Sequence, residues 1–165
     1  MTNIDIDFAK NWAATRTSDL AAHRELYAGE EEFALEARMV DDHLGDTITT
    51  TDEFNEELAQ YVNKDTGNGL GVQSLTVTEA FPGNGHVMIH WDYSVEGAAT
   101  FRGLPVEGKT LTSKGSTFLQ FNDAGKIVLE STILNENPIF QQLGQPIITP
   151  HYWEEGFDPA SLTAG

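Results

Sequence analysis

The sequence predicts an α+β protein in which three N-terminal helices pack on a curved, mostly antiparallel sheet. Apolar residues recur with a helical period over the first 62 positions, and with the alternating period of strands from residue 72 onward. A turn-rich segment, Lys64-Asp65-Thr66-Gly67-Asn68-Gly69, separates the two regions. Helices followed by a run of strands are typical of the α+β class.

Three helices are expected in the first region. The spacing predicts them at residues 7–14, 19–27 and 52–62. Phe8 and Trp12 lie four residues apart on one face of the first helix, and His23 and Tyr27 do so on the second. Ser18 is expected to cap the second helix, and the threonines at 50 and 51 are alternative caps for the third.

The strands are expected to follow one another as a meander. A short strand is predicted at 32–37, and a loop at 38–49. Four longer strands are predicted at 72–81, 87–100, 110–121 and 127–134, and a last short helix at 138–143. The connections contain Pro82-Gly83-Asn84-Gly85, the link Gly103–Lys109 and the turn Asn122–Gly125, which are rich in turn-forming residues.

One domain is expected over residues 1–144, because a chain of 165 residues suffices for one core and shows no internal repeat. Residues 145–165 form an aromatic C-terminal extension. Its apolar residues include Ile147, Tyr152, Trp153 and Phe157, which are too many for a free tail. We expect the extension to pack on the domain, on a partner subunit or at the mouth of a pocket.

The charge excludes several classes of partner. The chain has 26 acidic and 9 basic residues and a net charge of −17, so nucleic acid and anionic membrane surfaces are not expected to bind. No cysteine is present, and no apolar run is long enough to span a membrane. The N-terminus has no secretory signal pattern, so a cytoplasmic location is expected. Nucleotide-binding loops, the serine-hydrolase elbow and zinc-protease motifs do not occur in the sequence.

The stretch from His86 to Gly144 resembles the SnoaL-like polyketide cyclase branch of the NTF2-like superfamily. A long strand is followed by the link Gly103–Lys109 (GLPVEGK), a strand that ends in Phe121, the turn Asp123-Ala124-Gly125-Lys126 and a final strand. The resemblance extends over residues 8–144 and implies a cone-shaped domain around a small-molecule pocket. It also implies a homodimer through the outer face of the sheet, and chemistry that needs neither a cofactor nor a metal.

The sequence departs from this family at four positions of its characteristic motifs. The family motif I-V-E-x-W-x-x-x-D falls on a segment with Leu129, Ser131 and Asn135 in place of glutamate, tryptophan and aspartate. A histidine turn of the family falls on Glu96-Gly97-Ala98-Ala99, which has Gly97 at the histidine position. A standard cyclase mechanism is therefore not expected.

His90 and Asp92 are the first candidates for acid–base groups. Strand alternation places them together on one face, about 7 Å apart, with Trp91 and Tyr93 on the other. If their face lines the pocket, they form a base and an orienting carboxylate. If the aromatic face points inward instead, they lie in solvent or at a dimer interface.

Glu130 and His23 are the other catalytic candidates. Glu130 alternates with Leu129 and Ser131 on the last strand and is either a displaced proton shuttle or an exposed strand residue. His23 lies on the core side of its helix, where it either reaches the pocket or packs as a hydrogen-bonded core residue. The expected substrate-binding walls are aromatic: Trp12, Tyr27, Phe33, Trp91 and Tyr93.

The leading hypothesis is a cofactor-independent acid–base enzyme that acts on a hydrophobic small molecule by cyclisation, isomerisation or dehydration. The alternative hypothesis is a non-catalytic small-molecule-binding module with the same fold. An accessory interaction subunit, with the aromatic extension filling the cavity, is a third hypothesis.

Overall fold

A six-stranded sheet forms the centre of the protein, and its strand order is β2-β1-β8-β7-β4-β3. The computed structural model describes residues 5–38, 47–145, 156 and 158. The strands are β1 (Ala34–Arg38), β2 (Thr47–Ile48), β3 (Leu70–Gly83), β4 (His86–Ala98), β7 (Leu111–Phe121) and β8 (Ile127–Leu134). β1 pairs with β8 in parallel, while the other pairs in the sheet are antiparallel. A separate two-stranded ribbon consists of β5 (Thr100–Phe101) and β6 (Leu104–Pro105).

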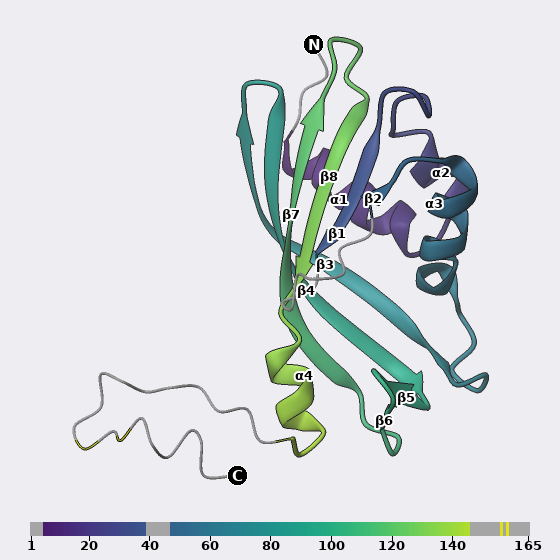
Figure 1. Cartoon of the computed structure of the whole chain (residues 1–165), viewed down its shortest axis with the longest axis vertical. Helices are drawn as coiled ribbons and strands as arrows, with labels where there is room; N and C mark the ends of the chain where they lie inside the picture. The colour runs from purple at the N-terminus through teal and green to yellow at the C-terminus, as the bar shows by residue number, and fades with distance from the viewer. Residues whose placement is uncertain (1–4, 39–46, 146–155, 157, 159–165) are drawn as a thin grey trace.

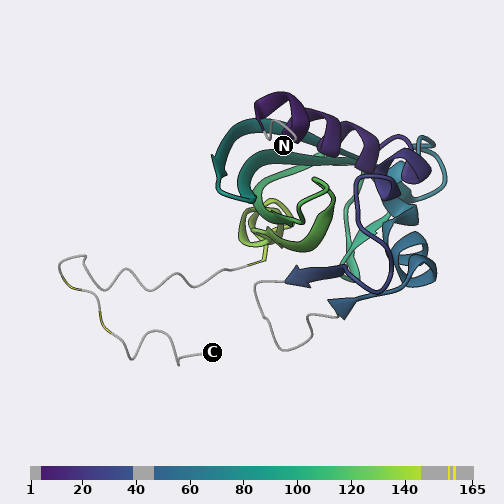
Figure 2. The ribbon, with the colours of Figure 1, turned by 90° about the horizontal axis from the view of Figure 1, so that it is seen from above.

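The N-terminal helices cover one side of this sheet, and one further helix lies beyond its lower end (Figure 1). They are α1 (Ile6–Arg16), α2 (Leu20–Arg24), α3 (Thr51–Leu58), the 3₁₀ segment η1 (Ala59–Val62) and α4 (Asn137–Gln142). Figure 1 shows α2 and α3 beside the sheet and α4 beyond the lower end of β8. Seen from above, the sheet bends into an open curve that the N-terminal helices close (Figure 2). The interior between the sheet and α1 to α3 is the space in which a site can be enclosed.

Side-chain caps fix where the helices begin. Asp5 caps α1, because its carboxylate accepts from the backbone N–H groups of Asp7 and Phe8 at 3.0 and 3.1 Å. Asp19 caps α2 by accepting from the Ala22 N–H at 3.0 Å, so the predicted cap, Ser18, lies one residue too early. α3 begins with a complete capping box formed by Thr50 and Glu53.

β4 divides the protein into a buried face and an outer face. Its odd-numbered residues point toward the helices and are at most 6% exposed: Val87, Ile89, Trp91, Tyr93 and Val95. Its even-numbered residues, among them His90 and Asp92, point outward. The apolar residues of β7, α1 and α3 join the buried face in one core.

The predicted fold class is confirmed: helices pack on a large curved sheet that is mostly antiparallel. Three details differ from the predicted elements. α2 ends at Arg24, three residues earlier than predicted, because the chain turns there to meet β8. The expected loop at 38–49 contains Arg38 at the end of β1 and the short strand β2, and residues 39–46 lie outside the described part of the chain. The predicted four-stranded meander is extended by β1, whose parallel pairing with β8 has no local sequence signature.

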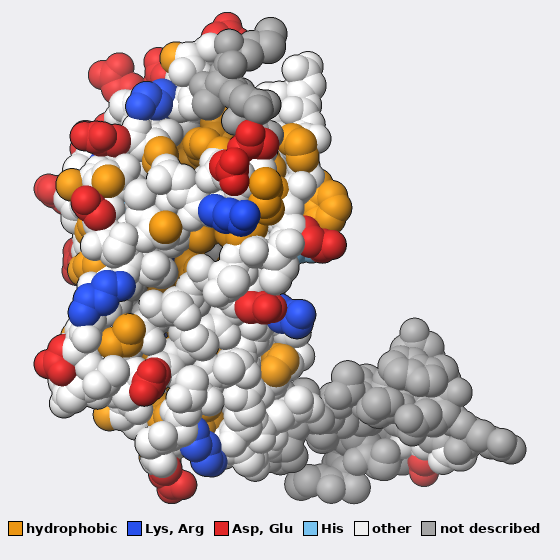
Figure 3. All heavy atoms as spheres, turned by 180° about the vertical axis from the view of Figure 1, so that it is seen from behind, with side chains coloured by type: hydrophobic (Ala, Val, Ile, Leu, Met, Phe, Trp, Pro, Cys, Tyr) orange, Lys and Arg blue, Asp and Glu red, His pale blue; other side chains and the backbone are white. Residues whose placement is uncertain are grey.

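Acidic side chains are spread over the surface. Figure 3 shows red acidic groups along the edges and upper part of one face, with fewer blue basic groups between them. This distribution matches the net charge of −17. The C-terminal extension lies almost entirely outside the described residues, so its predicted packing stays a prediction.

Candidate active site

A buried polar cluster lies between the N-terminal helices and the sheet. It contains Arg16 at the end of α1, His23 in α2, Tyr27 just after α2, and Glu130 and Thr132 in β8. Glu130 and His23 are 0% exposed, and Arg16 is 3% exposed. Charged side chains are seldom this buried unless they are paired, so the cluster is the first candidate for a functional site in the interior.

The carboxylate of Glu130 is the centre of the cluster. Its Oε1 accepts from Arg16 Nη1 and from Thr132 Oγ1, each at 2.7 Å. Its Oε2 accepts a short hydrogen bond from the Tyr27 hydroxyl. An ionised carboxylate can only accept hydrogen bonds, and here a guanidinium and two hydroxyls supply them.

Tyr27 connects this carboxylate to the helices. Its hydroxyl oxygen accepts from Trp12 Nε1 at 3.2 Å and lies 3.2 Å from His23 Nε2. The other ring nitrogen of His23, Nδ1, lies 2.9 Å from Thr15 Oγ1. The hydrogen bonds therefore run without a break from α1 through α2 to β8.

Main-chain pairing explains how the local sequence brings these residues together. After α2, the Ala28 N–H donates to the Ile127 carbonyl at 2.8 Å, and the Ile127 N–H donates to Leu26 at 2.9 Å. These bonds hold Tyr27 beside the first residue of β8. A register shift in the β7–β8 pairing lets Glu130, three residues further along β8, face inward as Ile127 does.

Burial and charge decide the protonation states of the cluster. Burial lowers the pKa of Arg16, but the neighbouring Glu130 and Tyr61 outweigh this effect and raise it above its usual value. Burial, and then the positive charge of Arg16, lower the pKa of His23 to about 2, so its imidazole is neutral near pH 7. Burial and the negative charge of Glu130 raise the pKa of Tyr27 well above 10, so its phenol keeps its proton.

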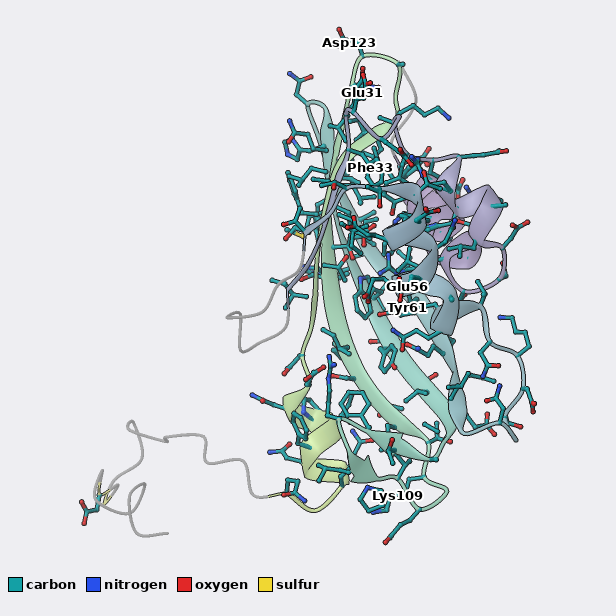
Figure 4. All side chains as sticks on the ribbon, turned by 45° about the vertical axis from the view of Figure 1, so that its right-hand side comes forward. Glu31, Phe33, Glu56, Tyr61, Lys109 and Asp123 are labelled. Atoms are coloured by element: carbon teal, nitrogen blue, oxygen red, sulfur yellow. The ribbon has the colours of Figure 1, made fainter. Side chains whose placement is uncertain are left out.

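Aromatic rings surround the cluster. The Arg16 guanidinium lies 5.3 Å from the ring centre of Trp12 and 4.8 Å from that of Tyr61. Figure 4 shows Phe33 and Tyr61 in the layer between the sheet and α3. Tyr61 belongs to η1 and is only partly buried, so one ring beside Arg16 is in contact with solvent.

The cluster extends across the sheet through hydroxyl groups. The indole N–H of Trp91 in β4 donates to Thr117 Oγ1 in β7 at 3.0 Å, and Thr117 lies 2.9 Å from Thr132 Oγ1. Because Thr132 gives its proton to Glu130, Thr117 must donate to Thr132. Three adjacent strands thus contribute donors that end at one carboxylate.

His90 and Asp92 lie on the opposite face of the sheet. Their side chains are 47% and 51% exposed, and each has a partner other than the one predicted: Glu79 Oε2 lies 3.3 Å from His90 Nδ1, and Lys114 Nζ lies 3.3 Å from Asp92. Asp92 borders two neighbouring pockets on the outer face, of about 520 and 330 Å³, and His90 borders the smaller one. The structure thus separates His90 and Asp92 from Glu130 and His23, and the catalytic role of either set stays a prediction.

The aromatic residues predicted as pocket walls all lie in the interior: Trp12, Tyr27, Phe33, Trp91 and Tyr93 are at most 6% exposed. Arg16 is the site residue that sequence reasoning missed. Its position four residues after Trp12, on the same helical face, was the available indication. From the sequence, an arginine at a helix end is expected to be a solvated charge. Its buried role becomes visible only when the strand that carries its partner is placed beside the helix.

Solved structures of other proteins share this architecture. AclR, a candidate hydroxylase from Streptomyces galilaeus, matches with a TM-score of 0.66 and 14% identity over 95% of both chains. IdmH, a candidate polyketide cyclase from Streptomyces antibioticus, matches with a TM-score of 0.63 and 19% identity over 84% of this chain and 96% of its own. An NTF2-like protein from Burkholderia pseudomallei matches with a TM-score of 0.58 and 15% identity over 82% of this chain and 93% of its own.

The fold is NTF2-like. The resemblance predicted from the sequence is confirmed at this level, since the solved structures with this NTF2-like fold include candidate polyketide cyclases. By sequence alone, no family model and no curated protein matches the chain. Identities below 20% leave the chemistry of the site to be argued from its own residues.

Two further observations concern the described part of the chain. None of its helices is long and apolar enough to cross a membrane. Within the same residues, no group of three or more histidine, cysteine, aspartate or glutamate side chains is arranged to hold a metal ion.

Proposed function

We propose that the protein is a cofactor-independent acid–base enzyme that acts on a hydrophobic small molecule, with Glu130 as the group that accepts and returns a proton. The observation that carries the proposal is a fully buried carboxylate that accepts a hydrogen bond from a phenol inside an apolar, aromatic interior. The reaction class is cyclisation, isomerisation or dehydration next to a carbonyl group. In each case the carboxylate takes a proton from carbon or oxygen of the ligand, and the proton returns at a second position.

The surroundings of Glu130 suit this role. Arg16 balances the charge of the carboxylate, so the cluster is close to neutral as a whole, which suits an uncharged ligand. Tyr27 is a neutral donor whose hydrogen bond holds the carboxylate in position. Because the pair is enclosed, ligand entry requires a movement of the groups that cover it, of which Tyr61 is partly exposed.

The solved structures support the class of ligand. Two of the solved structures that match the chain are candidate polyketide cyclases, from Streptomyces antibioticus and Xanthomonas campestris. Polyketide intermediates are hydrophobic and contain enolisable carbonyl groups, which is the chemistry that a buried carboxylate can address.

Hydrogen–deuterium exchange next to a carbonyl tests the proposal without knowledge of the natural substrate. The protein is incubated in D₂O with a panel of cyclic ketones, β-diketones and aryl ketones, and deuterium uptake is followed by NMR. We expect catalysed exchange for some ligands and a loss of about 100-fold or more in Glu130→Gln. Glu96→Gln, which changes an exposed glutamate of β4, is the matched control and should leave the rate unchanged.

Two outcomes of this assay would contradict the proposal. Exchange that survives in Glu130→Gln would remove the proton-transfer role from the buried carboxylate. Exchange that is lost instead in His90→Asn or Asp92→Asn would move the chemistry to the outer face, as the first prediction from the sequence had it.

A non-catalytic binding module is the second candidate function. It is favoured by the contrast between the enclosed cluster, whose groups satisfy one another, and the open outer pocket of about 520 Å³. The binding module would be supported if ligands bind to the protein and none of them undergoes deuterium exchange. The outer pocket also bears on the proposed homodimer, because a second copy on this face would cover it.

The homodimer proposal rests on the apolar side chains of the outer face. Phe81 and Ile133 are 51% and 43% exposed there. We expect a dimer by light scattering, and Ile133→Asp should shift it to monomer. A wild-type monomer at micromolar concentration would contradict this proposal and leave the outer pocket open to ligands.

A further inference from the structure

The Tyr27 hydroxyl has more neighbours than it has protons. A phenol oxygen carries one proton and can accept two hydrogen bonds. Its three partners are the Trp12 indole N–H, His23 Nε2 and the carboxylate of Glu130. The indole can only donate, and the carboxylate, paired with Arg16, can only accept. The phenolic proton therefore goes to Glu130.

This assignment fixes the tautomer of His23. With one lone pair of the Tyr27 oxygen facing Trp12 and the proton facing Glu130, only a second lone pair is left for His23. Nε2 at 3.2 Å must then carry the imidazole proton and donate it. Nδ1 is left without a proton and needs a donor, which the Thr15 hydroxyl provides at 2.9 Å.

The opposite tautomer leaves a group unpaired. With the proton on Nδ1, His23 would donate to Thr15, and Thr15 could give its own proton to the backbone carbonyl of Asn11 at 2.9 Å. Nε2 would then face the lone pairs of the Tyr27 oxygen with no proton between them. In the first arrangement the Asn11 carbonyl still has a helical N–H partner, as has the Trp12 carbonyl, which lies 3.1 Å from Thr15 Oγ1 and within hydrogen-bond reach of the His23 ring. An unmade hydrogen bond in a site that is 0% exposed is costly, so the Nε2–H tautomer is the stable one.

Burial and a neighbouring positive charge disfavour a doubly protonated His23, and they outweigh a hydrogen bond with the Trp12 backbone, which raises its pKa. Arg16 of α1 places a positive charge close to the ring, and α3 contributes only the apolar ring of Phe54, stacked 5.8 Å from it. Glu130 of β8, the one negative group of the cluster, is reached only through the Tyr27 hydroxyl. His23 therefore stays neutral and cannot serve as a base near pH 7.

We propose that His23 is a positioning residue: as the neutral Nε2–H tautomer it donates to the Tyr27 oxygen and thereby directs the phenolic proton onto Glu130. The proposal deepens the proposed function, on which its consequence for proton transfer rests. It assigns proton transfer to the Tyr27–Glu130 pair and leaves His23 to orient that pair.

Nitrogen-15 NMR of histidine-labelled protein tests the tautomer directly. Long-range proton–nitrogen spectra distinguish a protonated Nε2 from a protonated Nδ1, and the signals that disappear in His23→Gln identify the residue. We expect a protonated Nε2 and an unprotonated Nδ1, with no change between pH 5 and 8. A protonated Nδ1, or titration of the ring within that range, would overturn the proposal.

A pair of variants tests the positioning role in the exchange assay. His23→Leu removes the donor and should lower kcat about tenfold while the ligand Kd stays the same. His23→Gln keeps an N–H donor near the Tyr27 oxygen and should recover most of the loss. The pH profile of kcat should have the same shape in wild type and both variants.

The results separate this inference from the proposed function. If His23→Leu abolishes exchange and removes a limb of the pH profile near 6.5, His23 is itself the base and the inference is wrong, although the enzyme proposal stands. If no ligand undergoes exchange but NMR finds the neutral Nε2–H tautomer, the enzyme proposal fails, while the orientation of Tyr27 by His23 is confirmed.

Discussion

Removal of Arg16 gives the most direct measure of what holds the interior together. In Arg16→Met the side chain keeps its approximate length and loses its charge, so the carboxylate of Glu130 remains buried with hydroxyl donors only. The two partners of the ion pair are 4% and 0% exposed at their side chains and lie 2.7 Å apart. Solvent can therefore neither screen the pair nor hydrate a partner left alone.

The expected magnitude follows from burial. Removal of one partner of a buried pair costs about 3–5 kcal/mol, against a total stability of about 5–15 kcal/mol for an ordinary domain. With a urea m-value of about 2 kcal/mol/M, the midpoint should fall by about 1.5–2.5 M. Glu130→Gln should cost a similar amount, because it leaves the guanidinium unpaired. The double variant should lose less stability than the two single variants lose together, and the difference should be at least about 2 kcal/mol.

Urea unfolding followed by near-UV circular dichroism is the assay. Lys114→Met is the matched control, since it removes the cation of an ion pair with Asp92 whose side chains are 81% and 51% exposed. This exposed pair should contribute at most about 1 kcal/mol. If Arg16→Met were no more destabilising than Lys114→Met, or if the double-variant cycle showed no coupling, burial of the Arg16–Glu130 pair would not have the energetic role assigned to it.

Three further predictions concern other parts of the structure. The pKa of His23 falls from 6.5 in the unfolded chain to about 2, so the unfolded state binds more protons below pH 6.5. Wild type should therefore lose about 2 kcal/mol between pH 6.5 and 4.5 that His23→Gln does not lose, in urea titrations at both pH values. Gly115→Ala would place a Cβ 2.1–2.5 Å from ring atoms of Trp91, so it should lower stability by about 1–3 kcal/mol and alter tryptophan fluorescence. The control is Gly29→Ala, whose Cβ meets nothing within 4 Å and should change neither quantity. Thr50→Ala breaks the capping box of α3 and should lower stability by about 1 kcal/mol in thermal unfolding; an unchanged melting temperature would contradict the assigned cap.

Much of the fold could be predicted because its elements carry local patterns. The alternation of β4 predicts that Trp91 and Tyr93 share one face and that His90 and Asp92 share the other, and both pairings are found. The short pairing of β1 with β8 joins residues about 95 positions apart. No local preference encodes such a contact, because the two strands meet only through the fold of the chain between them.

The candidate site shows the same division. The sequence by itself determined the shared face of Trp91 and Tyr93, the alternation of Glu130 with its neighbours, and the core-side position of His23, since each follows from a period of two or of 3.6 residues. Only the tertiary structure decided which face of β4 is buried and that Arg16, Tyr27 and Glu130 meet. The physical reason is that a side chain's burial and ionisation depend on partners supplied by other elements. A glutamate in a strand is a solvated charge or a buried acceptor according to what packs above it.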